Sequence, residues 1–171
     1  IQYVHIIENR YAFEVNPEVS LGATQWLNIE RYNQPDLENS QRCVKRLRSA
    51  GYAIVATSPH VEGYTAASLP LDKPVAVLMG TEGRGLSDYL LEEADMKLRI
   101  PMYGFTESFN ISVSAAILLS SLRKRLESSD LNWKLNEEEQ TKLKIAWCKR
   151  TLIKGEQIER EVRRRIVGKE L

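Results

Sequence analysis

The sequence predicts an α/β domain built on a Rossmann-like parallel sheet, with a helical C-terminal extension. Segments of strand type alternate with segments of helix type, as expected for a parallel sheet covered by helices. Residues 75–79 (VAVLM) form a near-continuous apolar run, which is typical of a strand buried on both faces of such a sheet. A length of 171 residues with 43% hydrophobic content is sufficient for one domain of this kind.

Five short segments are predicted to be strands. Residues 1–7 (IQYVHII) are rich in β-branched and aromatic side chains, so we expect a buried strand there. Residues 26–32 (WLNIERY) form a second extended segment. The remaining predicted strands are residues 52–56, 75–79 and 96–100.

Five segments show the pattern of helices. They are residues 37–50, 88–94, 111–125, 136–150 and 156–166. The third of them begins with many small residues, which would let this helix approach a neighbouring element closely. The apolar face of the first is predicted to consist of Cys43, Val44 and Leu47.

Composition excludes several classes of protein. No apolar run approaches the roughly 20 residues that a membrane span requires, so we expect no membrane association. The two cysteines, Cys43 and Cys148, lie far apart in helix-like segments, which favours a reducing, cytoplasmic compartment over a disulfide scaffold. With only His5 and His60 available and no close Cys/His spacing, we expect no metal site.

Charge is unevenly distributed along the chain. The net charge is +1, yet residues 141–169 contain ten Lys or Arg residues and three Glu residues. Such a basic tail is compatible with a solvated helix face or with contacts to an anionic partner.

The candidate site lies where three predicted strands end. Ligands of open parallel sheets bind beyond the carboxyl ends of the strands, and polar or glycine-rich loops follow there at Thr57, residues 80–85 and residues 101–110. The loop GTEGRG is neither a P-loop nor a GxGxxG fingerprint. Nucleoside-triphosphate hydrolysis and ordinary dinucleotide binding are therefore disfavoured.

The loop before residue 111 places a hydroxyl, an aromatic ring and an amide together. These are Ser108, Phe109 and Asn110. Simple capping of the following helix by Ser108 or Asn110 is one interpretation, and contact with a ligand is the other.

Two stretches together resemble a known family. Residues 79–86 (MGTEGRGL) and residues 100–113 (IPMYGFTESFNISV) are similar to the second and third motifs of the SPOUT RNA 2′-O-methyltransferases, TrmH (SpoU) branch. The resemblance covers residues 1–125, and residues 137–150 are more loosely similar to the terminal helix of tRNA-modifying members. Phe109 stands where the family usually has Leu.

The resemblance implies a C-terminal trefoil knot, S-adenosyl-L-methionine as cofactor, and a homodimer formed through the knot helices. The residues that it implies for cofactor binding are Thr57, Met79, Gly80, Gly85, Ile100, Met102 and Phe109. Ser108 and Asn110 are implied to orient the substrate, and Glu82 to organise the second-motif loop.

The family reaction is an in-line attack of a ribose 2′-hydroxyl on the sulfonium methyl. It releases a neutral thioether and needs no metal, so catalysis depends on positioning and on removal of the hydroxyl proton. The arginine of the family's first motif precedes the strand that begins here at Ile1, and no matching Asn–small–Arg helix is present. We therefore expect that an upstream segment is missing and that the chain as given methylates little.

With an RNA substrate implied, the basic tail favours RNA contact. We expect residues 1–126 to form the methyltransferase domain and residues 127–171 the basic extension, with Ile158, Val162 and Ile166 anchoring the last helix. The expected phosphate contacts are Arg123, Arg125, Lys149, Arg150, Arg163, Arg164 and Arg165.

The resemblance thus implies S-adenosylmethionine-dependent 2′-O-methylation of RNA, with a guanosine in the tRNA D-loop as the expected target. A ribosomal-RNA methyltransferase of the same branch is the nearest alternative. A non-catalytic RNA-binding knot protein is an alternative of another class. A nucleotide-dependent dehydrogenase lacks its fingerprint and ranks last.

Overall fold

The structure is a computed structural model that describes residues 1–9, 12–14, 16, 20, 22–35 and 38–167. The chain divides into two compact units. One combines Ile1–Ile6, Ala12–Arg31 and Lys134–Leu171, and the other combines Ile7–Tyr11 and Tyr32–Trp133. The loops of the candidate site all belong to the second unit.

The second unit is built on a parallel three-stranded sheet. Its strands are β3 (Ala53–Thr57), β4 (Val75–Leu78) and β5 (Met96–Leu98), in the order β4-β3-β5. In the register, Val55 of the central strand lies opposite Val77 and opposite Met96. The predicted α/β class with a parallel sheet is confirmed.

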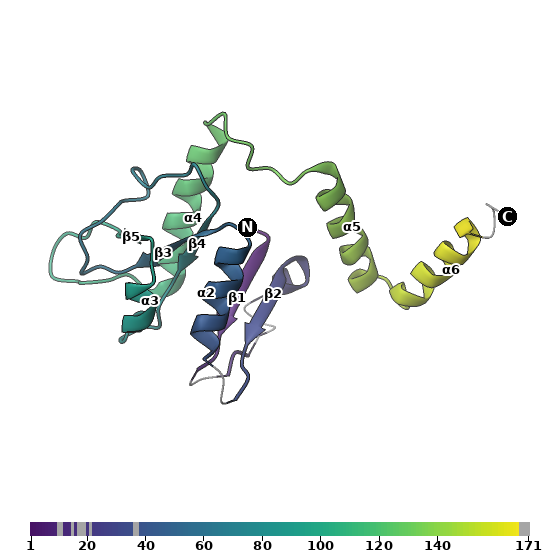
Figure 1. Ribbon diagram of the computed structural model, residues 1–171, viewed down its shortest axis with the longest axis horizontal. Helices are drawn as coiled ribbons and strands as arrows, with labels where there is room; N and C mark the ends of the chain where they lie inside the picture. Colours follow the sequence, from purple (N-terminus) through teal and green to yellow (C-terminus); the bar gives the residue numbers. More distant parts are fainter. Residues whose placement is uncertain (10–11, 15, 17–19, 21, 36–37, 168–171) are drawn as a thin grey trace. The chain divides into compact units, whose positions relative to one another are not determined.

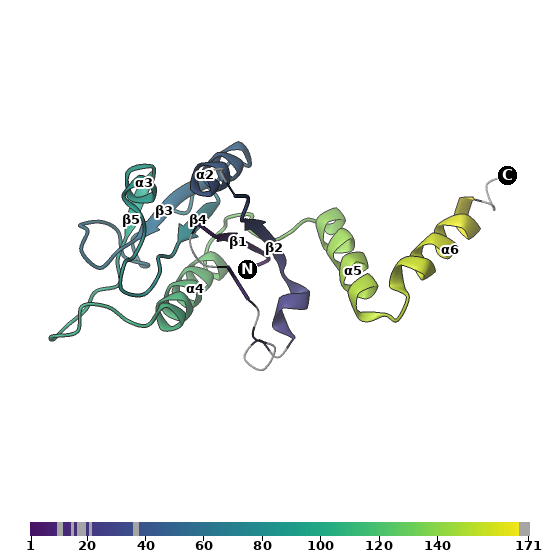
Figure 2. The same cartoon turned by 90° about the horizontal axis from the view of Figure 1, so that it is seen from below.

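Helices cover both faces of this sheet (Figures 1 and 2). Helices α2 (Asn39–Ser49) and α3 (Asp88–Glu92) lie on one face, and α4 (Ile111–Glu127) lies on the other. Because side chains alternate along a strand, β4 contributes to both cores. Ala76 and Leu78 pack on the core that contains α2, whereas Val75 and Val77 pack on the core that contains α4.

The predicted buried face of α2 is observed, whereas strand β4 is less buried than predicted. The apolar face of α2 is confirmed, since Cys43, Val44 and Leu47 are all buried; Leu37, the predicted first residue, lies outside the described residues. Full burial is predicted for strand β4, and this is wrong, because all four of its residues are half-buried. Its place at the edge of the sheet explains the difference.

The segment after β3 folds back along β5. Tyr64 forms a parallel bridge with Leu98, and its backbone N–H donates to the carbonyl of Lys97 at 2.9 Å. A side chain at Gly63 would bring a Cβ within 2.5 Å of that carbonyl oxygen, so this close approach requires glycine. The segment thereby pairs an otherwise open edge of the sheet.

Residues 1–7 do not join the three-stranded sheet. Strand β1 (Tyr3–Ile7) pairs with β2 (Asn28–Tyr32) in a separate two-stranded sheet, and none of its residues is buried. The prediction of a buried strand is therefore wrong. The second extended segment is shorter than predicted, because Trp26 ends a 3-10 helix, η1 (Ala23–Trp26).

Two helices follow α4. Helix α5 (Glu137–Thr151) begins with a capping box in which Asn136 and Glu139 satisfy each other's backbone N–H groups. Helix α6 (Gly155–Val167) follows a short turn. Trp147 of α5 donates its indole N–H to the Trp26 carbonyl at 3.1 Å, so α5 contacts η1 within the first unit.

Within the described part of the chain, no helix combines the length and apolar character needed to cross a bilayer. Cys43 is buried, Cys148 is exposed, and neither forms a disulfide within the described residues.

Candidate functional site

Three loops follow the carboxyl ends of the parallel strands. Residues 58–63 follow β3, residues 79–87 follow β4, and residues 99–110 lead from β5 to α4. Because parallel strands end at one edge of a sheet, all three loops start there. The polar and glycine residues predicted for the site lie on these loops or at the strand ends.

The glycine-rich loop is a tight turn held by its own backbone. Thr81 and Gly85 exchange two backbone hydrogen bonds, of 3.1 and 2.8 Å. A Cβ on Gly80 would lie 2.1 Å from the carbonyl carbon of Gly85, so the turn can close only on a glycine. Gly83 and Gly85 have φ of 82° and 68°, and a Cβ on either would meet no atom within 4 Å. Their backbone therefore lies open to a ligand.

Asn110 joins this loop to α4. Its Oδ1 accepts from the backbone N–H of Ser112 at 2.8 Å, so Asn110 is the N-cap of α4. Its Nδ2 donates to Oε1 of Glu82 at 2.6 Å, and the backbone N–H of Ile111 points at the same oxygen from 3.4 Å. The Glu82 carboxylate thus faces the positive end of the helix dipole.

The residues predicted to bind the cofactor differ in their contacts and in their burial. Thr57 donates its hydroxyl to the Leu78 carbonyl at 2.8 Å, which ties the ends of β3 and β4 together. Met79 and Ile100 pack on the core beneath α4, and Met102 is half-buried. Phe109 keeps 41% of its surface exposed. Strand β5 ends at Leu98, so Ile100 lies in the loop and not in the predicted strand.

These residues fit a cofactor with an apolar ring and polar edges. The strand ends offer apolar side chains, and a ligand can approach the backbone closely at Gly83 and Gly85, although the N–H and C=O of Gly85 are already bonded to Thr81. The polar groups of the site are amide N–H donors and carbonyl acceptors, which suit a neutral base and ribose.

The chain matches a known family. Residues 1–120 match the model of the SpoU rRNA Methylase family. The chain belongs to this family. It is 40% identical over 149 residues to a tRNA (guanosine(18)-2′-O)-methyltransferase of Borreliella burgdorferi, covering 87% of this chain and 66% of that protein. The chain therefore spans about two thirds of the length of this curated relative.

Solved structures agree with the family assignment. This SpoU methylase chain superposes on a TrmH/SpoU tRNA modifying enzyme of A. aeolicus with a TM-score of 0.72 and 28% identity, covering 89% of this chain and 77% of that one. It also superposes on an AdoMet-bound rRNA methyltransferase from Sinorhizobium meliloti with a TM-score of 0.58 and 27% identity. This superposition covers 71% of this chain and 45% of that one. The predicted membership of the TrmH (SpoU) branch is confirmed.

Three of the arginine and lysine residues predicted to contact RNA have protein partners elsewhere in the fold. Arg125 donates from Nη1 to the carbonyls of Ala66 and Leu69, both at 2.8 Å. Arg150 donates to the carbonyls of Gln25 and Leu27 at 2.8 and 3.1 Å. These contacts hold backbone turns together, and sequence reasoning missed them because no local pattern indicates a partner so distant along the chain. Lys149 pairs with Glu159 at 2.6 Å.

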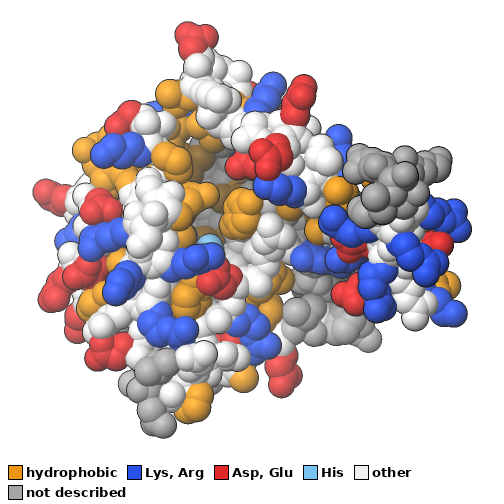
Figure 3. Space-filling model, turned by 45° about the vertical axis from the view of Figure 1, so that its right-hand side comes forward, with side chains coloured by type: hydrophobic (Ala, Val, Ile, Leu, Met, Phe, Trp, Pro, Cys, Tyr) orange, Lys and Arg blue, Asp and Glu red, His pale blue; other side chains and the backbone are white. Residues whose placement is uncertain are grey.

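The other predicted RNA-contact residues carry exposed guanidinium groups. Arg123 lies 4.1 Å above the Trp133 ring and pairs with Glu127. Arg163 pairs with Glu159, and both Arg164 and Arg165 pair with Glu161 within α6. Figure 3 shows Lys and Arg side chains gathered over α6.

One prediction about α6 is wrong. Ile158, Val162 and Ile166 were expected to anchor the helix, yet they are 45%, 49% and 57% exposed. The spacing of these residues does form a stripe, but nothing in the described part of the chain covers it fully.

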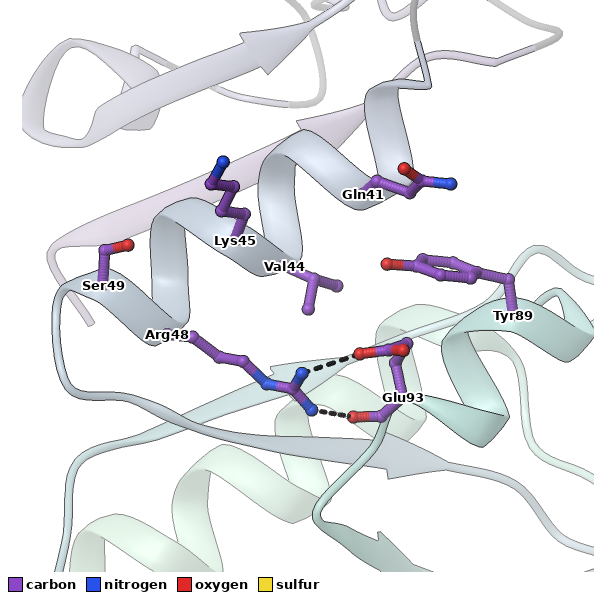
Figure 4. Close-up of a pocket in the computed structure, with 7 residues that line it drawn as sticks. All are labelled: Gln41, Val44, Lys45, Arg48, Ser49, Tyr89 and Glu93. Carbon is purple, nitrogen blue, oxygen red and sulfur yellow. Dashed lines mark hydrogen bonds and ion pairs between the residues drawn. The ribbon is translucent and has the colours of Figure 1, made fainter.

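A hollow of about 320 Å³ lies between α2 and α3 (Figure 4). Arg48 extends across it and donates to the Glu93 carboxylate at 2.7 Å and to the Glu93 carbonyl at 2.6 Å. Burial, and then the charge of Glu93, raise the pKa of the Tyr89 hydroxyl above its ordinary value. The residues that line it are Gln41, Val44, Lys45, Arg48, Ser49, Tyr89 and Glu93. None is a predicted site residue, so this hollow is not the candidate site.

Proposed function

We propose that the protein transfers a methyl group from S-adenosyl-L-methionine to the ribose 2′-hydroxyl of a guanosine in tRNA, in the D-loop. The observation that carries this proposal is the contact between Asn110 and Glu82, which joins the two motif loops at one edge of the sheet. The name of the Borreliella burgdorferi relative supports a tRNA guanosine as the target.

S-adenosylmethionine would be held by the strand ends and the glycine turn. The proposed contacts are Thr57, Met79, Gly80, Gly85, Ile100, Met102 and Phe109. When bound, the cofactor supplies an electrophilic methyl group. The AdoMet-bound enzyme of Sinorhizobium meliloti supports this choice of cofactor.

The polar residues of the site would position the reactants. Glu82 and Asn110 hold the glycine turn against the start of α4, which sets the shape of the cofactor pocket. Ser108 is exposed beside them and would orient the substrate ribose. Precise placement of two reactants lowers the barrier substantially because their entropy is lost on binding.

We infer that the fold closes into a trefoil knot and that two copies associate through α4. The knot is what the resemblance of residues 79–86 and 100–113 to the second and third family motifs implies. The start of α4 and the loop before it carry exposed apolar side chains, which favours an interface. They are Tyr103, Phe105, Phe109, Ile111 and Val113. Sedimentation equilibrium should give a dimer, and a monomer at all concentrations would contradict this part.

Residues 1–126 are proposed to carry the chemistry and residues 127–171 to add RNA affinity in the cytoplasm. The basic residues of α6, together with Arg123 and Lys149, are exposed or partly exposed and suit phosphate contacts. Arg125 and Arg150 would first have to release the carbonyls that they bind.

The alternative RNA is ribosomal. The family description and the Sinorhizobium meliloti enzyme both refer to rRNA. A matched pair of substrates separates the two: a tRNA transcript and a fragment of 23S rRNA, each incubated with labelled S-adenosylmethionine. We expect label in tRNA, at one guanosine, and none when that ribose is already 2′-O-methylated. Cofactor binding with no transfer to either RNA would support a non-catalytic RNA-binding role.

A further inference from the structure

One arginine lies at the tip of the glycine turn. Arg84 is between Gly83 and Gly85, on the loop that follows β4 at the carboxyl edge of the sheet. It is exposed, and its side chain forms no hydrogen bond or ion pair with any residue that the structure describes. Arg123 and Arg125, by contrast, both have protein partners. Arg84 is therefore a positive charge at the proposed site that the chain itself leaves without a partner.

The turn holds the backbone of Arg84 in place. Thr81 and Gly85 exchange two backbone hydrogen bonds at the base of the turn. On the other side of the tip, the carboxylate of Glu82 accepts a hydrogen bond from the side chain of Asn110. A side chain on such a fixed turn loses little backbone freedom when a ligand binds, and this favours affinity.

Carboxylates on the neighbouring loops contact other groups. Oε1 of Glu82 accepts from Asn110 at 2.6 Å, and Oε2 of Glu107 lies 3.9 Å from Nε2 of His60. Neither carboxylate is paired with Arg84. Its guanidinium group is thus available to an external anion, and the planar fork of donors matches the oxygens of a phosphate. On an RNA substrate the anionic groups are the backbone phosphates.

We propose that Arg84 binds the phosphate on the 3′ side of the target guanosine and thereby positions the 2′-hydroxyl for methyl transfer. This role rests on the proposed function. The 2′-hydroxyl is next to the ribose carbon that carries the 3′-phosphate, so a fixed phosphate restrains the hydroxyl. Gly85, a proposed cofactor contact, directly follows Arg84, so a phosphate bound there would lie beside the methyl donor. Arg84 is a positioning residue that takes up no proton and contacts no reacting atom.

Binding of a synthetic tRNA with one neutralised phosphate tests the proposal. Two RNAs are compared, both with 2′-deoxyguanosine at the target position so that no transfer occurs, and one with a methylphosphonate as its 3′-phosphate. With S-adenosylhomocysteine bound, the wild type should bind the neutralised RNA about tenfold more weakly. Arg84→Gln should bind the ordinary RNA about tenfold more weakly than the wild type does, and should bind both RNAs equally. If Arg84→Gln discriminates between the RNAs as strongly as the wild type, the proposal is overturned.

A matched control lies at the other end of β4. Lys73 is exposed and carries the same charge, but it precedes the strand and so lies at the amino edge of the sheet. Lys73→Gln should discriminate between the two RNAs as the wild type does. Arg84→Gln should also reduce the slope of log affinity against log salt by about one, and Lys73→Gln should not. Equal slopes for the two variants would count against a phosphate contact by Arg84.

Two measurements separate a phosphate contact from damage to the turn. Arg84→Gln should bind S-adenosylhomocysteine as the wild type does, because the arginine side chain has no partner within the described residues. A loss of cofactor affinity equal to that of Gly80→Ala would show a distorted turn and overturn the proposal. Arg84→Lys should restore part of the salt slope because it keeps the charge without the bidentate geometry. A slope identical to that of Arg84→Gln would contradict an electrostatic contact.

The proposed function and the role of Arg84 can fail separately. A wild type that binds S-adenosylhomocysteine but no tRNA would contradict both. Strong tRNA binding by the wild type that is indifferent to the 3′-phosphate and to Arg84→Gln would overturn the role of Arg84 alone.

Discussion

The side-chain amide of Asn110 donates a 2.6 Å hydrogen bond to the carboxylate of Glu82, 28 residues earlier in the chain. Asn110 also caps α4 through its other side-chain atom. One residue therefore starts the helix and fixes the glycine turn against it. The contact buries no charge, because both side chains lie in exposed positions.

Asn110→Ala removes both contacts. We expect the helix cap to cost about 1 kcal/mol of stability, and we expect affinity for S-adenosylhomocysteine to fall about tenfold because the turn loses a charge-assisted hydrogen bond. Titration calorimetry and urea unfolding measure the two effects. Asn136→Ala is the matched control, since Asn136 caps α5 but touches no site loop. It should lose stability without losing cofactor affinity.

Gly80→Ala should distort the glycine turn. The new Cβ would lie 2.1 Å from the carbonyl carbon of Gly85, so the backbone must move at a cost of about 1–3 kcal/mol. In Gly83→Ala the new Cβ would meet no atom within 4 Å, but the alanine would have to adopt a φ of 82°. This left-handed backbone conformation costs a non-glycine residue about 1–2 kcal/mol of stability. Urea unfolding should rank Gly80→Ala as the more destabilised variant and the weaker cofactor binder. Wild-type cofactor affinity in both variants would show that the turn is not part of the pocket.

Arg125→Met should destabilise the second unit. The substitution leaves the carbonyls of Ala66 and Leu69 without their donor, and an unsatisfied buried polar group costs about 1–3 kcal/mol. Arg123→Met, two residues earlier in the same helix, removes an exposed pair with Glu127 and should cost less. Thermal unfolding compares the two. A larger loss for Arg123→Met would contradict the structural role of Arg125.

The contacts of Glu159 predict a pH dependence of the α5–α6 pair. Hydrogen bonds from Lys149 and then Arg163 hold the pKa of the Glu159 carboxyl below its ordinary value of 4.5. A lowered folded-state pKa contributes stability above the unfolded-state value, and this stability is lost as the pH falls through the folded-state value. Wild-type helicity, followed by circular dichroism, should therefore decrease on acidification below 4.5 more than that of Glu159→Gln. Identical acid profiles would contradict a stabilising role for this carboxylate.

Replacing the three arginines of α6 should weaken RNA binding in a salt-dependent way. Changing Arg163, Arg164 and Arg165 to Gln should lower the affinity for tRNA and reduce the slope of log affinity against log salt by up to about three. The matched control changes Arg42, Lys45 and Arg46 of α2, which removes the same charge from another helix. Equal effects from both triple variants would indicate a general charge effect and no contact by α6.

Local patterns were sufficient to predict most elements. The apolar face of α2, the parallel strand around Val77 and the start of α4 at Ile111 were all predicted within a few residues. Each depends on neighbours within one or two turns, or on side-chain alternation, which the sequence displays directly. The two site loops were also predictable, because polar and glycine residues followed each strand.

The failures concern contacts between distant residues. The separate sheet formed by β1 and β2, and the incomplete burial of β4 at a sheet edge, depend on which strands pair. No local signal distinguishes an arginine that binds RNA from Arg125, whose partners lie 56 and 59 residues away. The stripe of α6 has the spacing of a buried face, but its burial depends on a partner surface.

By itself, the sequence determined the α/β class, the glycine turn and the polar loop, and it carried the motifs of the SpoU family. Only the tertiary structure decided which distant residues lie together. Asn110 donates to Glu82, His60 lies near Glu107, and Arg125 donates to the Ala66 carbonyl. The physical reason is range. Backbone preferences act between neighbours, whereas a hydrogen bond or ion pair needs two groups within about 3–4 Å of each other, and only the packed fold sets that distance.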